Sequence, residues 1–106
     1  MIAVSHTNIF AKWLKKLKDH QAKAKIMANI DRIKEGNLGV TRFLGEGVFE
    51  KKINYAGDYR LYFTNYHESL ILLLCGGNKA TQQADIKTAK KIRKELDESK
   101  NYCQTI

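Results

Sequence analysis

Two neighbouring strand-like segments carry the residues whose types and spacing could do chemistry. Alternate side chains of an extended strand point to one face, so Glu50 and Lys52 share a face, as do Arg60 and Tyr62. Antiparallel pairing of the two segments would bring Glu50 and Lys52 beside Arg60, and Lys79 follows the next apolar segment after a glycine pair. These positions predict a cationic patch of Lys52, Arg60 and Lys79, flanked by Glu50 and Tyr62.

Such a patch suits cleavage of an RNA phosphodiester without a metal ion. A 2′-hydroxyl that attacks the adjacent phosphorus needs a base, cations for the charge on the phosphorane oxygens, and an acid for the departing oxygen. Lys52 would act as the base and Arg60 as a fixed phosphate fork, with Lys51 as a further cation. A plainer alternative is cross-strand ion pairing of Glu50 with Lys52 or Arg60. Spacing alone leaves both interpretations open.

Length and composition restrict the classes of protein. The chain has 106 residues with 19 Lys plus Arg, 11 Asp plus Glu and a formal charge of +8. A chain this short supports one core, so we expect a single domain over residues 1–106 and no cofactor. Neither the apolar run 70–75 nor the N-terminus predicts a membrane span or a secretory signal, and we expect a cytoplasmic protein. Cys75 and Cys103 form no metal-binding motif, so no metal is expected.

The periodicity of apolar residues predicts the elements that must position the patch. They are a strand at 1–5, a helix capped by Thr7 or Asn8 and carrying an apolar stripe over 10–17, a helix at 20–35, strands at 48–53, 59–66 and 70–75, and a helix at 82–99. This order predicts an α+β fold, with a small antiparallel sheet, an N-terminal helical hairpin and a C-terminal helix packed on one face. Arg60 and Tyr62 would then lie on the open face.

The charge excess is concentrated in residues 1–35, where the first helix has one apolar and one cationic face. Trp13 belongs to the apolar stripe, so we interpret it as a core residue and not as a platform for stacking a base. Lys15 and Lys16 lie on the cationic face. An excess of this kind suits a polyanionic partner, either a nucleic acid or an acidic protein, and charge alone does not choose between them.

Two segments together make a specific pattern. They are Tyr-Arg-Leu-Tyr-Phe at 59–63 and Gly-Gly-Asn-Lys at 76–79, followed by Gln82 and by Asp-Ile at 85–86. With the run 47–53 and the helices before it, they resemble the phage-related addiction-module killer proteins of the RelE/ParE toxin superfamily, in the HigB-like branch. The resemblance covers nearly the whole chain.

The resemblance implies a RelE-like fold and the toxin of a type II toxin–antitoxin system. It would inhibit translation by ribosome-dependent, metal-independent cleavage of mRNA. The matching positions imply catalytic roles for Lys52, Arg60 and Lys79, and RNA-binding roles for Lys51, Tyr62 and Gln82. Lys52 stands where this branch usually has arginine, and Asp85 stands close to where some RelE enzymes carry a catalytic tyrosine.

The resemblance also implies partners. They are a HigA-like helix-turn-helix antitoxin, the ribosome and mRNA, with operator DNA bound only through the antitoxin and no membrane. We expect an acidic antitoxin segment to contact Lys15 and Lys16, or to cover the patch. Two other classes stay open: a ParE-like toxin that inhibits DNA gyrase without nuclease chemistry, and an inactive member that binds only its antitoxin or RNA.

Overall fold

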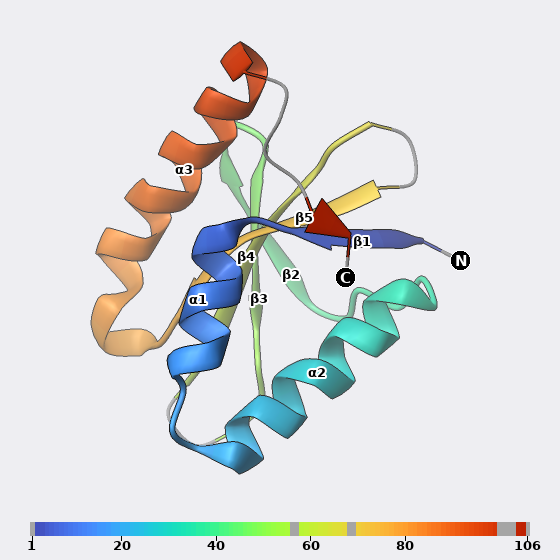
Figure 1. Ribbon diagram of the computed structural model, residues 1–106, viewed down its shortest axis with the longest axis vertical. Coiled ribbons are helices and arrows are strands. Elements are labelled where there is room, and N and C mark those ends of the chain that lie inside the picture. The colour runs from blue at the N-terminus through green and yellow to red at the C-terminus, as the bar shows by residue number, and fades with distance from the viewer. Residues whose placement is uncertain (1, 56–57, 68–69, 100–103, 106) are drawn as a thin grey trace.

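The computed structural model describes residues 2–55, 58–67, 70–99 and 104–105, and Figure 1 shows their arrangement. In chain order the elements are β1 (Ala3–His6), α1 (Asn8–Lys16), α2 (His20–Lys34), β2 (Thr41–Gly45), β3 (Val48–Lys52), β4 (Arg60–Asn65), β5 (Leu70–Gly77), the 3₁₀ turn η1 (Lys79–Thr81), α3 (Gln82–Ser99) and β6 (Gln104–Thr105). The α+β class is therefore confirmed. No helix in the described ranges combines the length and apolarity needed to cross a membrane.

The sheet is mixed, which corrects the expectation of an antiparallel sheet. Its strand order is β2-β3-β4-β5-β1-β6. Strands β2 to β5 follow one another as an antiparallel meander, but β1 pairs with β5 in parallel. A short hairpin forces two strands to run antiparallel, whereas β1 and β5 are joined only through two helices and three other strands. The direction of β1 was therefore not fixed by the local turns that the sequence pattern shows.

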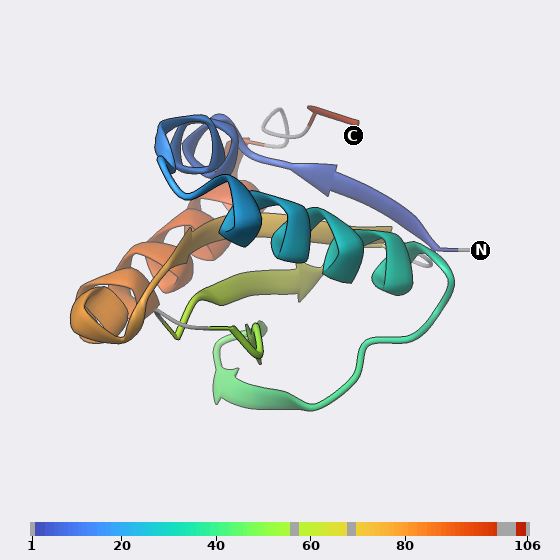
Figure 2. The ribbon, with the colours of Figure 1, turned by 90° about the horizontal axis from the view of Figure 1, so that it is seen from below.

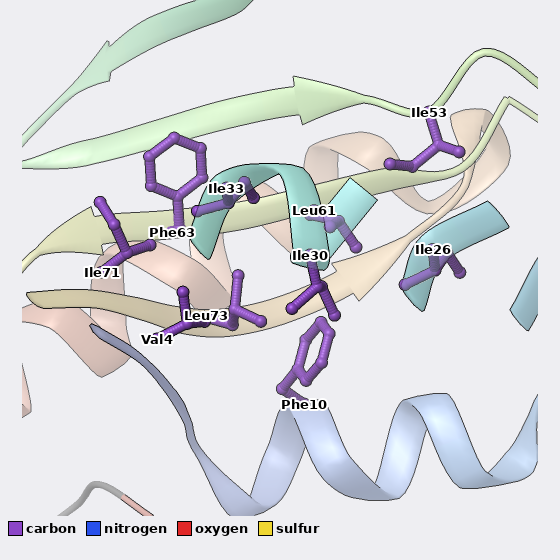
Figure 3. Packing of buried hydrophobic residues seen from close by; sticks show 10 residues of the cluster. All are labelled: Val4, Phe10, Ile26, Ile30, Ile33, Ile53, Leu61, Phe63, Ile71 and Leu73. Atoms are coloured by element: carbon purple, nitrogen blue, oxygen red, sulfur yellow. The ribbon is translucent and has the colours of Figure 1, made fainter. Parts of the chain in front are cut away.

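Helices cover both faces of the sheet, which corrects the expectation that all helices pack on one face. Helices α1 and α2 bury an apolar cluster against one face, as Figure 3 shows; its members include Phe10, Ile30 and Leu61. Helix α3 buries a second cluster against the opposite face, through Ala89, Ile92 and Leu96. Strand β5 contributes side chains to both clusters, so it is buried on both faces.

Local capping explains where the helices begin. The Thr7 hydroxyl accepts a hydrogen bond from the Phe10 amide at 3.1 Å and donates to the Leu74 carbonyl at 2.6 Å, which caps α1 and ties it to β5. The Asp19 carboxylate accepts hydrogen bonds from the first amides of α2. Both caps satisfy amides that have no partner within the helix. The predicted helices are thus confirmed, and the bounds of α3 agree with the prediction at both ends.

Strand β2 was not predicted. It forms one edge of the sheet and pairs only with β3. Its side chains are exposed or half-buried, and Phe43 is 61% exposed. An edge strand whose two faces are both partly exposed to solvent shows little alternation of apolar and polar residues. That alternation is the pattern from which a strand is predicted, so β2 could not be recognised.

Candidate functional site

The three residues predicted as catalytic lie at one corner of the sheet, where β3 ends, β4 begins and β5 ends. Lys52 and Arg60 are paired across β3 and β4, so their side chains share a face. Arg60 is in turn paired with Gly77, the last residue of β5, and Lys79 follows it in η1. We call Lys52, Arg60 and Lys79 the basic corner.

The three side chains differ in exposure. The Lys52 side chain is 60% exposed and its Nζ lies 3.6 Å from Asp58 Oδ1, and Lys79 is also exposed. Arg60 is only 8% exposed, and its Nη1 donates to the Asp58 carbonyl at 2.8 Å. The expectation that Arg60 lies on an open face is therefore wrong, because the start of α3 covers part of that face.

Glu50 connects three elements beside the basic corner. Its buried carboxylate lies 3.3 Å from Arg42 Nη2 of β2 and 3.7 Å from Arg60 Nε of β4, and it accepts a hydrogen bond from Gln82 Nε2 of α3 at 2.9 Å. The ion-pair alternative is thus found for Arg60, whereas Lys52 pairs with Asp58. Arg60 is a positioned cation, and Glu50 determines where it points.

Tyr62 does not lie on an open face either. It is fully buried under α3, in the cluster that also contains Val48 and Ile92. Its hydroxyl has no hydrogen-bond partner among the described residues, and burial, with the carboxylates of Glu50 and Asp85, raises the pKa of Tyr62. Its ring contacts protein here, so no base can stack on it in this arrangement.

The other predicted binding residues lie on different surfaces. Lys51 points to the α2 side of the sheet, where it is buried and its Nζ donates to the Leu38 carbonyl at 2.7 Å. Burial, with the nearby Arg32 guanidinium, lowers the pKa of Lys51. Lys15 and Lys16 are exposed in the last turn of α1, away from Glu50 and Gln82.

Sequence reasoning missed Arg42, which lies on the unpredicted strand β2. Its side chain is 61% exposed although its guanidinium reaches the buried Glu50 carboxylate. Register would have found it once β2 was known, since Arg42 pairs directly with Glu50. Trp13, interpreted as a core residue, is half-buried and packs against the cluster under α1 and α2.

The chemistry available at the corner is that of cations and a carboxylate. No group of three or more His, Cys, Asp or Glu side chains in the described part of the chain could hold a metal ion. Cys75 is free and buried in β5, and burial, together with the Asp85 carboxylate, raises the pKa of its thiol to about 12. A thiol protonated at neutral pH is a poor nucleophile.

We expect Cys75 to resist alkylation in the folded protein. In a Cys103→Ser variant, iodoacetamide at pH 8 should react with Cys75 at least about 100-fold more slowly in the native state than in urea, because a raised pKa keeps the thiol protonated and burial blocks access. Mass spectrometry of timed samples measures both rates. Equal rates in the two states would show that the thiol is exposed and ionised.

Comparisons with known proteins place this geometry in context. Residues 12–97 match the family described as phage-derived Gp49-like protein (DUF891). The chain is 45% identical over 95 residues to an uncharacterized protein of Haemophilus influenzae, an alignment that covers 90% of this chain and 96% of that protein.

Solved structures extend the comparison to the fold. RelE in the intact E. coli RelBE toxin–antitoxin complex is 14% identical with a TM-score of 0.61, covering 74% of this chain and 96% of that chain. The isolated E. coli RelE toxin has the same identity and TM-score, covering 82% of this chain and 98% of that chain. The expected RelE-like fold is therefore confirmed.

Proposed function

The chain belongs to the family of phage-derived Gp49-like proteins and has the fold of RelE, and on this premise we propose that it is the toxin of a type II toxin–antitoxin system. We further propose that it inhibits translation by ribosome-dependent, metal-independent cleavage of mRNA. The observation that supports this most is the basic corner, where Lys52 is paired with Arg60, and Lys79 follows the end of β5 that pairs with Arg60.

The residues at the corner divide into two kinds. Lys52 and Lys79 are exposed, so both can contact the scissile phosphate. The neutral amine of Lys52 is the proposed base that takes the proton of the attacking 2′-hydroxyl. The Lys79 ammonium would stabilise the charge that develops on the phosphate oxygens and give a proton to the departing 5′-oxygen. Arg60 is held by Glu50 and by the Asp58 carbonyl, so its charge contributes to the local field from a fixed position. Gln82 fixes the start of α3 against the same carboxylate.

We propose a HigA-like antitoxin as the protein partner, with operator DNA bound through it. The RelE structure determined as part of an intact toxin–antitoxin complex supports a partner of this kind. Lys15 and Lys16 are exposed, as contact with an acidic antitoxin segment requires. Loss of antitoxin affinity after charge reversal at both lysines, measured by calorimetry, would support this surface, and unchanged affinity would exclude it.

Primer extension on an mRNA in a reconstituted translation system tests the nuclease proposal. The wild type should give cuts only when ribosomes are present, and Lys52→Ala and Lys79→Ala should each reduce the cutting rate by about 100-fold or more. Lys91→Ala is the matched control, because Lys91 is an exposed lysine of α3 that lies with Glu46 and Gly47, at the start of β3 and not at the basic corner, and its cutting rate should stay within about twofold of the wild type.

Other outcomes would overturn the proposal. Absence of cutting while the protein still stops growth would move it to the gyrase-inhibiting class. Absence of both would leave a member that only binds its partner. Unchanged cutting by Lys52→Ala and Lys79→Ala would place the chemistry away from the basic corner.

A further inference from the structure

A second basic surface lies between α2 and the end of β3. A groove of about 560 Å³ runs between α2 and the end of β3, and is lined chiefly by Lys25, Asn29, Arg32, Lys51, Lys52 and Asn54. Figure 2 shows that the segment 35–40 leaves the end of α2 and curves round to the start of β2. We call this the α2 groove.

The α2 groove carries cations without compensating acids. Its described lining contains four basic side chains and no Asp or Glu. Lys25 and Arg32 are exposed and, among the described residues, take part in no ion pair, while the exposed Lys52 pairs only with Asp58, outside the lining. Lys51 is held in place by the Leu38 carbonyl, so one cation of the groove is fixed. A lining of this composition favours an anionic ligand.

We propose that the α2 groove binds the sugar-phosphate backbone of a single RNA strand, beside the basic corner. This inference rests on the proposed function, because Lys52 belongs to both the groove and the corner and would join them into one path. Cations spaced like the phosphates of an RNA strand are enough to neutralise those phosphates, and no apolar contact is required. Ala28 and Val40 are the only apolar residues in the described lining of the groove, whereas the core of a protein–protein interface is mostly apolar.

Another basic surface, on α3, provides the contrast. Lys90, Lys91 and Lys94 line it with Glu46. Lys90 Nζ lies 3.5 Å from Glu46 Oε2, so part of this charge is already paired. Its exposed members Lys91 and Lys94 allow a control with the same change in net charge as in the α2 groove.

Fluorescence anisotropy with a labelled 2′-O-methyl RNA oligonucleotide tests the proposal, because this probe lacks the attacking hydroxyl and cannot be cleaved. We compare Lys25→Glu/Arg32→Glu with Lys91→Glu/Lys94→Glu. Each pair reverses two charges and so lowers the net charge by 4, from +8 to +4. The groove variant should raise the Kd at least about 10-fold and reduce the slope of log Kd against log salt by about 1.4, which is about 0.7 for each of two lost contacts to a single strand. The α3 variant should raise the Kd less than about threefold.

Other results would overturn the proposal. Equal losses in the two variants would show that only net charge matters, and no loss in either would show that RNA binds elsewhere; both would overturn the proposal. Unchanged RNA affinity together with lost antitoxin affinity would assign the groove to an acidic protein. Thermal unfolding of both variants monitors folding, and these exposed positions should leave the Tm within a few degrees.

Failure of this inference can be told apart from failure of the proposed nuclease. Lys79 does not line the groove, so Lys79→Ala should lose cutting and keep most of its affinity for the uncleavable RNA. Groove-specific RNA binding by a wild type that never cuts would retain the groove and reject the nuclease. Cutting without groove-specific binding would do the reverse.

Discussion

Replacing Glu50 by alanine is expected to lower the free energy of unfolding by about 3 kcal/mol, a fall in Tm of more than 10 °C for a domain of this size. Glu50 is 7% exposed, and its carboxylate lies between Arg42, Arg60 and Gln82. Its removal would leave the buried Arg60 guanidinium without its counter-ion, and an unpaired buried charge is far more costly than a lost surface pair. Urea unfolding followed by circular dichroism measures the change.

Two further variants separate this explanation from simple loss of side-chain volume. Glu46 also forms an ion pair, with Lys90, but its side chain is 70% exposed, so Glu46→Ala should cost no more than about 0.5 kcal/mol. In Glu50→Leu/Arg60→Met the unpaired charge is gone, and stability should recover most of the way to that of the wild type. A loss below about 1 kcal/mol for Glu50→Ala would show that the Arg60 charge is solvated by other means.

The basic corner differs from the surface that the alternation of side chains along the two strands predicts. The pattern of the two strands correctly places Lys52 beside Arg60, because register needs only the hairpin between them. It does not say which face a helix will cover. Arg60 and Tyr62 share a face that α3 partly covers, so the first becomes a positioned cation and the second a core residue.

The sequence does contain a signal for this covered face. The run 70–75 is continuously apolar, and a strand of this kind is buried on both faces. With α1 and α2 on one face, only the remaining helix, α3, could cover the other. Applied to β4, the same reasoning would have placed Tyr62 inside the protein. Arg42 was beyond such reasoning, because β2 has no apolar periodicity to reveal it.

The Gly76-Gly77 pair lies beyond the predicted strand at 70–75 but belongs to β5. Both residues lie within β5, and Arg60 and Leu61 of β4 are paired with them. A Cβ at Gly76 would overlap the indole ring of Trp13, and a Cβ at Gly77 would overlap the Asp85 carboxylate. The two glycines therefore let α1 approach one face of β5 and α3 approach the other, at the strand end that leads into Lys79.

Gly76→Ala is expected to destabilise the protein by about 3 kcal/mol, at the upper end of what overpacking costs, because the new methyl group meets a rigid ring. Trp13 is the only tryptophan, so its fluorescence reports the displacement. Its emission should shift to longer wavelength as the ring becomes more exposed to water. The urea concentration at the midpoint of unfolding should fall. In a Trp13→Ala background the ring is absent, so adding Gly76→Ala should then cost less than about 1 kcal/mol. Equal costs in both backgrounds would show that the indole does not set the requirement for glycine.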